Sequence, residues 1–200
     1  MIRTEHAVAP STRSRALFLD RDGVININHG YVYIAKNFEF IDGIFELVRT
    51  AHVNDFKIVV ITNQSGIGRG FYSERQFHQL TSWMCEEFLN AGAPIDKVYF
   101  SPFHPTEGLG EYRKDDFSRK PNPGMILQAQ MELGLDLNNS ILIGDKTTDI
   151  QAGIAAGIGL NIFFGQEHPL EAISQQCHVI TSLLEALALL NKHVQSQVLK

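Results

Sequence analysis

The chain has 200 residues, of which 44% are hydrophobic and 20% are charged, a composition that excludes disordered chains and small disulfide-held scaffolds. Its formal net charge of −5 offers no overall basic surface for nucleic acid or for an anionic membrane. No apolar run approaches the roughly 20 residues that span a bilayer. The two cysteines, Cys85 and Cys177, show no C-x-x-C spacing, so we expect reduced thiols and a cytoplasmic location.

The first residues are polar and show no periodicity, and we expect a flexible leader at 1–15 followed by a single domain at 16–200. Short apolar runs then alternate with segments of helical periodicity. The runs that predict buried strands are Ala16–Asp20, Lys57–Ile61, Val98–Phe100, Ile141–Ile143 and Ile158–Phe164. The segments that predict helices are Gly43–Asn54, Ser73–Ala91, Pro123–Leu133, Thr148–Ala156 and Ser182–Leu190. This alternation predicts an α/β fold with a doubly wound, mainly parallel sheet.

Four polar segments follow predicted strands, at the edge where an open α/β sheet binds its ligand. In the first, Asp20 and Asp22 stand two residues apart in a turn that Gly23 permits. Two acids so placed can face one site, one as a nucleophile or Mg²⁺ ligand and the other as a general acid and base. The alternative is an ordinary surface turn with solvated acids.

The other three segments supply a hydroxyl, a cation and further acids. Thr62 ends a strand and can donate its hydroxyl to a phosphate oxygen, and Lys120 can supply a positive charge for phosphate and carboxylates. Asp145 follows a strand, with Asp149 one helical turn later, and such hard oxygen ligands suit Mg²⁺. Each segment alone has an ordinary alternative, namely a polar turn or a solvated loop lysine.

In order and strand context the four segments resemble the motifs of the haloacid-dehalogenase (HAD) superfamily of aspartyl phosphatases. The stretches that further resemble the D-glycero-D-manno-heptose 1,7-bisphosphate 7-phosphatases are Phe18–Asn26, His29–Val32, Phe38–Phe40, Thr62–Gly66, Arg119–Pro121 and Gly144–Lys146. The resemblance implies a Rossmann-like HAD fold without a cap domain. It also implies a Mg²⁺-dependent phosphoric monoester hydrolase that removes the 7-phosphate of a heptose bisphosphate, in precursor synthesis for lipopolysaccharide or other surface glycans.

The resemblance also implies roles for individual residues. Asp20 would be the nucleophile that forms an aspartyl-phosphate, and Asp22 would be the general acid and base. Thr62 and Lys120 would hold the transferring phosphoryl group. Mg²⁺ would bind to the carboxylate of Asp20, the backbone carbonyl of Asp22 and the carboxylate of Asp145. The substrate-binding residues would be Asn28, His29, Gly30, Tyr31, Asn63, Gln64, Ser65, Lys146 and, for the second phosphate, Arg119.

The chain departs from this resemblance in a loop that often binds zinc in such families, through cysteines and a histidine. The corresponding places hold Ser101, Phe103, Asp116 and Ser118, and His104 beside them has no cysteine partner. Because structural zinc sites usually rely on thiolates, we expect no structural zinc.

Other functions remain open at this point. Histidinol-phosphate phosphatases and other small sugar-phosphate phosphatases share the framework, and a non-catalytic binding protein could use the same fold. A phosphotransfer role is not favoured, because Gly66–Gly70 lacks the Lys-Ser/Thr ending of a P-loop. We expect a monomer whose partner is a small sugar phosphate, with neither nucleic acid nor a membrane as a partner.

Overall fold

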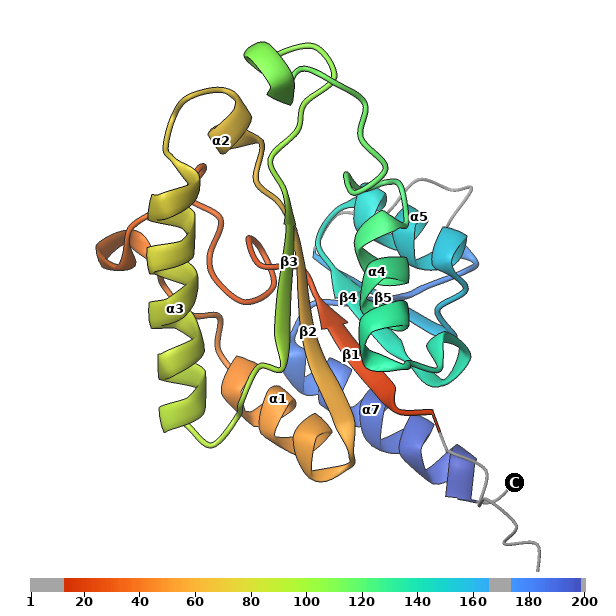
Figure 1. The fold of residues 1–200 in the computed structure, drawn as a ribbon. Helices are drawn as coiled ribbons and strands as arrows, with labels where there is room; N and C mark the ends of the chain where they lie inside the picture. Colours follow the sequence, from red (N-terminus) through yellow and green to blue (C-terminus); the bar gives the residue numbers. More distant parts are fainter. Residues whose placement is uncertain (1–12, 166–173, 199–200) are drawn as a thin grey trace, which may run out of the picture.

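The computed structural model describes residues 13–165 and 174–198, and this part of the chain folds around one parallel sheet (Figure 1). The strands are β1 (Arg15–Leu19), β2 (Phe56–Asn63), β3 (Lys97–Ser101), β4 (Ile141–Gly144), β5 (Leu160–Phe164) and β6 (His178–Ile180). Their order across the sheet is β3-β2-β1-β4-β5-β6, and each neighbouring pair is parallel. The predicted doubly wound α/β fold is therefore confirmed.

Within the described residues, helices connect β1 to β2, β2 to β3, β3 to β4 and β4 to β5, and one helix follows β6. They are α1 (Ile44–Val53), α2 (Ser65–Gly68), α3 (Glu74–Asn90), α4 (Gly124–Leu133), α5 (Thr147–Ala156), α7 (Leu183–Val198) and the 3₁₀ turns η1 (Ala35–Asn37), η2 (Gly110–Tyr112) and η3 (Leu137–Asn139). Local sequence sets several of their ends. Ser73 caps α3 in a capping box with Gln76, and α4 ends at Gly134 with a left-handed φ of 63°.

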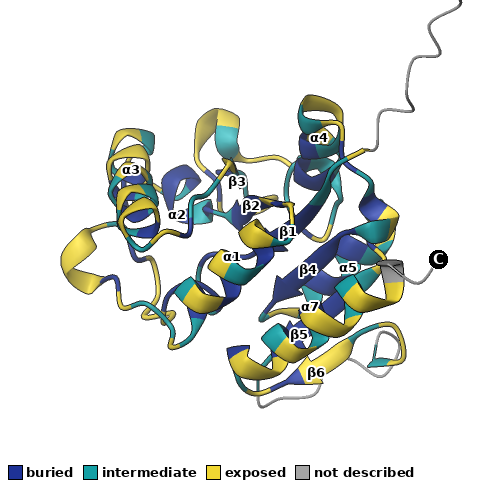
Figure 2. Cartoon of the chain, turned by 90° about the horizontal axis from the view of Figure 1, so that it is seen from below, coloured by how far each residue is buried: buried dark blue, intermediate teal, exposed yellow. Residues whose placement is uncertain are grey.

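Helices cover both faces of the sheet, and β1 shows how the sequence achieves this. Leu17 and Leu19 pack in the apolar layer shared with α1, α3 and α7, whereas Ala16 and Phe18 pack in the layer shared with α4 and α5. Strands buried on both faces are continuous apolar runs rather than alternating ones. Seen from below, the buried strands lie between helices whose outer faces are exposed (Figure 2).

The structure differs from the predicted elements at several places. The edge strand β6 was not predicted, because it has three residues of which two are exposed, too short for a recognisable apolar run. The single turn α2 was also not predicted. Strand β5 begins at Leu160 rather than Ile158, and α7 continues past Leu190 to Val198.

The expected leader falls largely on residues 1–12, which lie outside the described residues. Arg15, expected as its last residue, is instead the first residue of β1. Its guanidinium lies 4.4 Å from the centre of the Phe56 ring and donates to the carbonyl oxygen of Asn54 at 2.9 Å. Arg15 also pairs with Phe56 of β2, so the strand begins one residue earlier than predicted.

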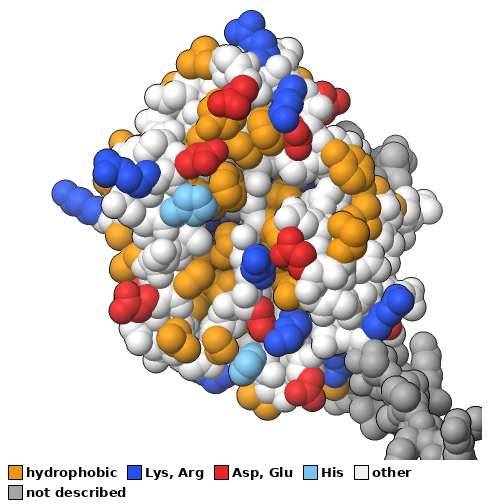
Figure 3. Space-filling model, viewed as in Figure 1, with side chains coloured by type: hydrophobic (Ala, Val, Ile, Leu, Met, Phe, Trp, Pro, Cys, Tyr) orange, Lys and Arg blue, Asp and Glu red, His pale blue; other side chains and the backbone are white. Residues whose placement is uncertain are grey.

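Within the described ranges, no helix is long and apolar enough to cross a membrane. On the face shown in Figure 3, acidic and basic side chains are interspersed with apolar ones, and neither sign of charge gathers into one continuous patch.

Candidate active site

The carboxyl ends of β1 and β4 meet at the point where the strand order reverses. The two strands are parallel neighbours, and the chain leaves β1 towards β2 on one side of the sheet and β4 towards β5 on the other. Asp20 follows β1 directly and Asp145 follows β4 directly. In open α/β sheets the ligand crevice forms at this reversal, so the two acids stand where the fold places a site.

Lys120 lies at the centre of a buried cluster of charges. Its ammonium lies 2.8 Å from a carboxylate oxygen of Asp20 and 2.7 Å from one of Asp149, and it donates to the carbonyl oxygen of Ile61 at 2.9 Å. Burial by itself would lower the pKa of Lys120, but the carboxylates of Asp149 and Asp20 outweigh burial and raise it. The site therefore keeps a fixed positive charge beside Asp20.

Asp20, Asp145 and Asp149 form an acidic group, and the single buried charge of Lys120 does not neutralise all three carboxylates. Ligand oxygens of Asp20, Asp145 and Asp149 lie within 4.8 Å of one another. Burial, with the charge of Asp20 added, raises the pKa of Asp145 to about 7. Its Oδ1 is buried and accepts no hydrogen bond, with the Lys146 ammonium 3.8 Å away. Both oxygens of Asp149 are engaged, with Lys120 and with the backbone N–H of Lys146. Asp20 and Asp145 thus fit a hard divalent cation such as Mg²⁺.

The turn after β1 brings backbone into contact with this acidic group. Gly23 has a φ of 100°, and a Cβ at this position would lie 2.1 Å from Oδ2 of Asp145. Only glycine fits such a close approach at a positive φ.

Asp22 is held by a separate set of donors. Its carboxylate accepts from the Arg21 guanidinium at 2.7 Å, from the Asn26 amide at 3.1 Å and from the Gln64 amide at 3.1 Å. Arg21 is 1% exposed, so the pair is largely shielded from water. These contacts fix the carboxylate at one end of the site.

Gln64 also orients the hydroxyl of Thr62. The Gln64 side-chain amide donates to Oγ1 of Thr62 at 2.8 Å, and the hydroxyl of Tyr72 donates to the Gln64 side-chain carbonyl oxygen. Because Thr62 accepts this bond, its own single proton is available for another acceptor. A phosphate oxygen in the site could be that acceptor.

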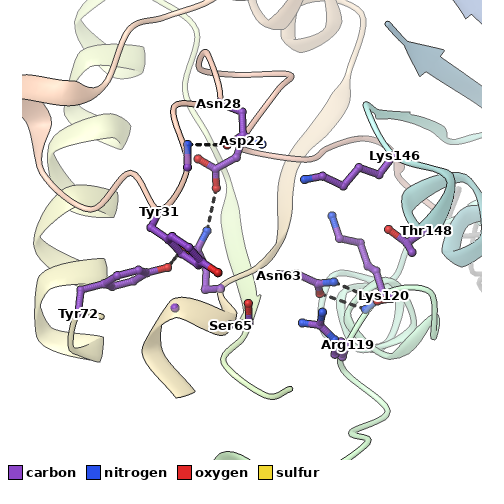
Figure 4. A pocket seen from close by; sticks show the side chains of 13 residues that line it. Asp22, Asn28, Tyr31, Asn63, Ser65, Tyr72, Arg119, Lys120, Lys146 and Thr148 are labelled. Carbon is purple, nitrogen blue, oxygen red and sulfur yellow. Dashed lines mark hydrogen bonds between the residues drawn. The ribbon is translucent and has the colours of Figure 1, made fainter. Parts of the chain in front are cut away.

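A pocket of about 380 Å³ opens beside these groups (Figure 4). Its lining residues are Asp22, Asn28, Gly30, Tyr31, Asn63, Gln64, Ser65, Gly66, Tyr72, Arg119, Lys120, Lys146 and Thr148. In Figure 4, Lys120, Arg119 and Lys146 lie on one side of the pocket, and the rings of Tyr31 and Tyr72 lie on the other. The pocket therefore suits an anionic molecule.

The structure brings together nearly all of the predicted site residues. Of the nine predicted substrate-binding residues, eight line the pocket and His29 does not. The His29 side chain is half exposed and lies 3.5 Å from Glu39. Asp20 and Thr62 are buried beside the pocket, at 4% and 1% exposure, and Asp145 is partly buried in the acidic group.

The sequence indicated Asp149 as a hard oxygen ligand by its place four residues after Asp145, and in the structure Asp149 binds Lys120. Several other residues of the site were not predicted, among them Gly66 and Thr148 of the pocket lining. Arg21, Asn26 and Tyr72 hold Asp22 and Gln64. Their types are common in turns and loops, so the sequence carried no signal for these contacts.

Known proteins with similar sequences are phosphatases. The family model for HAD-hydrolase-like proteins matches residues 117–163. The D-glycero-alpha-D-manno-heptose-1,7-bisphosphate 7-phosphatase of Burkholderia mallei is 55% identical over 150 residues, which are 75% of this chain and 79% of that protein. The D-glycero-beta-D-manno-heptose-1,7-bisphosphate 7-phosphatase of Yersinia pestis is 45% identical over 157 residues, 78% of this chain and 84% of that protein.

Solved structures agree on the fold. A Mesorhizobium loti protein described as a HAD-like phosphatase superposes with a TM-score of 0.78 at 31% identity, covering 97% of this chain and 91% of that one. The D,D-heptose 1,7-bisphosphate phosphatase from B. bronchiseptica, solved with magnesium and phosphate, superposes with a TM-score of 0.76 at 23% identity, covering 89% and 98%.

Proposed function

Because the chain belongs to the D-glycero-manno-heptose-1,7-bisphosphate 7-phosphatases, phosphoric monoester hydrolases of the HAD superfamily, we propose that its pocket binds a heptose bisphosphate for removal of the 7-phosphate beside Asp20. Such an enzyme serves heptose-precursor synthesis for lipopolysaccharide. The observation that carries the proposal is the buried Lys120 held between Asp20 and Asp149, next to a pocket with a cationic wall.

The proposed reaction has two steps. A carboxylate oxygen of Asp20 forms a bond to phosphorus while the bond from phosphorus to the sugar oxygen breaks, and Asp22 donates a proton to the departing oxygen. Asp22 then takes a proton from the water that cleaves the aspartyl-phosphate, which regenerates Asp20. Lys120 and the free hydroxyl proton of Thr62 hold the phosphoryl oxygens in both steps.

Mg²⁺ is the cofactor of this proposal, held by the carboxylates of Asp20 and Asp145 and by the backbone carbonyl of Asp22. The buried oxygen of Asp145 that accepts no hydrogen bond supports its place in the set. When bound, the ion supplies positive charge that lets an anionic carboxylate approach an anionic phosphate.

We expect Mg²⁺ binding to weaken in acid, because protons compete with the ion for Asp145. With a pKa of about 7, Asp145 is largely ionised at pH 8 and largely protonated at pH 6. The Kd for Mg²⁺ should therefore be about tenfold higher at pH 6 than at pH 8, as measured by calorimetry. Asp145→Asn is the matched variant and should bind Mg²⁺ weakly at both pH values. An equal Kd for the unaltered protein at pH 6 and pH 8 would contradict this.

Arg119 lines the pocket next to Lys120, and we propose that it binds the phosphate that is not cleaved. Arg119→Ala should lower kcat/KM for the bisphosphate about 30-fold, since a charge-assisted guanidinium–phosphate contact is lost. The loss on a sugar monophosphate should stay below about threefold. Arg75→Ala, on the exposed surface of α3, serves as the control. Equal losses on both substrates would assign Arg119 to the reacting phosphate instead.

The loop at residues 101–118 should need no zinc. The Nδ1 of its single imidazole, His104, accepts from the backbone N–H of Glu107 at 3.1 Å, and the loop contains no cysteine. The melting temperature in Mg²⁺-free buffer should therefore be unchanged by a zinc chelator. Stoichiometric zinc in the purified protein, lost on chelation together with several degrees of melting temperature, would overturn the expectation.

The proposed function is tested by phosphate release from the alpha and beta anomers of the heptose bisphosphate, with and without Mg²⁺. Both anomers are used because the similar proteins carry names of both kinds. Mg²⁺-dependent release from either anomer, with kcat/KM above that for histidinol phosphate, supports the proposal. Preference for histidinol phosphate, or no turnover of any substrate, would replace it with one of the alternative functions.

We further propose that residues 16–200 act as a single domain, as a monomer and in the cytoplasm. The single sheet that runs through the described residues supports the single domain. Light scattering coupled to gel filtration checks the monomer, and a dimer mass at micromolar concentration would contradict it.

A further inference from the structure

The loop that carries Arg119 is tied to the end of β3 by a short chain of polar side chains. The hydroxyl oxygens of Ser118 and Ser101 lie 3.0 Å apart, and the Ser118 hydroxyl donates to a carboxylate oxygen of Asp116 at 2.6 Å. The backbone N–H of Ser118 donates to the same oxygen at 3.0 Å. Ser101 is fully buried. We call Ser101, Asp116 and Ser118 the serine clasp.

The serine clasp has one consistent arrangement of protons. The single hydroxyl proton of Ser118 goes to the Asp116 carboxylate, the stronger and nearer acceptor, so the Ser101 hydroxyl is the donor to Ser118. Burial would raise the pKa of Asp116, but the two bonds from Ser118 and the nearby Lys114 ammonium outweigh burial and lower it. Asp116 therefore stays ionised at neutral pH, as the clasp requires.

Lys114 ties a further part of the loop to the clasp. Its ammonium lies 3.0 Å from the Asp116 carboxylate and 4.0 Å from the centre of the Phe103 ring. The Lys114 ammonium thus links the part of the loop near Phe103 to the part near Asp116, in addition to the link through the two serines.

The two sides of the loop meet at Arg119. Its backbone N–H donates to the carbonyl oxygen of Asp116 at 2.9 Å, and its guanidinium donates to the carbonyl oxygen of Phe103 at 2.9 Å. Asp116 belongs to the serine clasp, and Phe103 stands two residues after Ser101. The position of the guanidinium in the pocket therefore depends on the clasp staying closed.

The neighbouring Lys120 is held by other groups. Asn63 brackets its backbone, accepting from the Lys120 N–H at 3.1 Å and donating to its carbonyl oxygen at 3.0 Å. The Lys120 ammonium is fixed by Asp20, Asp149 and the carbonyl oxygen of Ile61. Opening of the clasp should hence disturb Arg119 and leave Lys120 in place.

We propose that the serine clasp is a positioning device for Arg119, and that it sets how strongly the enzyme prefers a bisphosphate to a monophosphate. The inference rests on the proposed function, in which Arg119 binds the phosphate that is not cleaved. The clasp residues do not touch the substrate; they act through Arg119.

The kinetic test uses Ser118→Ala, which removes the hydroxyl that joins Ser101 to Asp116. KM for the heptose bisphosphate should rise about fivefold with kcat within twofold of the unaltered enzyme, because Lys120 and Asp20 keep their contacts. KM for mannose 6-phosphate, a sugar monophosphate used as the probe, should change by less than about twofold. Ser118→Thr keeps the hydroxyl and should restore the KM for the bisphosphate.

Ser140→Ala is the control, because Ser140 is buried as fully as Ser101 and its hydroxyl bonds the backbone of Ala16 and Asp136, outside the clasp. Both Ser118→Ala and Ser140→Ala should lower the melting temperature by about 3 °C, but Ser140→Ala should not change the ratio of the two KM values. An unchanged ratio in Ser118→Ala, or the same change of ratio in Ser140→Ala, would overturn the proposal.

A second measurement does not depend on turnover. Hydrogen exchange in Ser118→Ala should speed up at the backbone N–H groups of Ser118 and Arg119, which bond to Asp116, and should stay unchanged at Lys120, which bonds to Asn63. Unchanged exchange at Ser118 and Arg119 would overturn the clasp even if the enzyme cleaved no bisphosphate. Faster exchange in an enzyme that cleaves no bisphosphate would leave the clasp standing and reject the proposed function.

Discussion

Asp20→Asn should lower kcat by at least about four orders of magnitude, because an amide cannot replace the carboxylate that attacks phosphorus. The fold should survive the change. Asparagine has the same shape, and its side-chain oxygen can still accept from the Lys120 ammonium, which lies 2.8 Å from Asp20 Oδ1. Steady-state kinetics and the melting temperature together test this expectation, with the melting temperature within about 3 °C of the unaltered protein.

The exposed Asp42 offers the control, since Asp42→Asn removes a carboxylate that is not part of the acidic group and should leave kcat unchanged. Peptide mapping after acid quench should locate a phosphoryl group on the peptide that contains Asp20 in the unaltered enzyme. Residual activity of Asp20→Asn above about one hundredth would reject the covalent role.

Lys120→Met should be the most destabilising change in the site. Lys120 is 3% exposed, and its ammonium neutralises Asp20 and Asp149. Removing one partner from a buried group of charges leaves the others uncompensated, at a cost of about 4 kcal/mol in the free energy of unfolding. The melting temperature should fall by about 10 °C, and kcat by at least about a thousandfold, since the phosphoryl group loses a fixed cation.

The pH dependence of this loss has a definite sign. The raised pKa of Lys120 means that its stabilising charge persists through the neutral range and is lost only above its ordinary pKa of about 10. In Lys120→Met the orphaned carboxylates bind protons more readily, so the difference in unfolding free energy from the unaltered protein should shrink as the pH falls from 8 to 5. Urea denaturation at several pH values measures this difference.

A second substitution separates charge from packing at the same place. Adding Asp149→Asn to Lys120→Met removes one of the two carboxylates that Lys120 contacts and should recover part of the lost stability. Lys36→Met, at an exposed position, should change the unfolding free energy by less than about 0.5 kcal/mol. A double variant no more stable than Lys120→Met would show that the loss comes from packing instead.

The sequence by itself determined the fold class and the edge of the sheet where the site lies. The apolar run before Asp20 and the run before Asp145 are strands buried on both faces. Such runs can be recognised in the sequence without knowing which strands they pair with. Because parallel strands end at the same edge, acids that follow two of them share that edge, and they come close where the strands are neighbours, as β1 and β4 are. The periodicity and the capping of α3 from Ser73 likewise depend on neighbours within one helical turn.

Only the tertiary structure decided which side chains touch within that edge. Lys120 meets Asp20 across 100 residues of chain, and Gln64 meets Asp22 across 42. Such pairings depend on how the loops fold over the sheet, and the periodicity of the sequence does not indicate how they fold. The same holds for Arg21, which is buried against Asp22 although arginine is ordinarily exposed.

In the loop at residues 101–118, the sequence determined some features and only the tertiary structure decided others. Its composition was enough to predict that no thiolate site forms there, because cysteine is absent from it. The bonds that hold it instead, between Ser101, Ser118 and Asp116, come from residue types that are found in any polar loop. The structural role of these hydrogen bonds depends on Ser101 being buried at the end of β3. Burial of a polar side chain is decided by the packing around it rather than by its neighbours in the sequence.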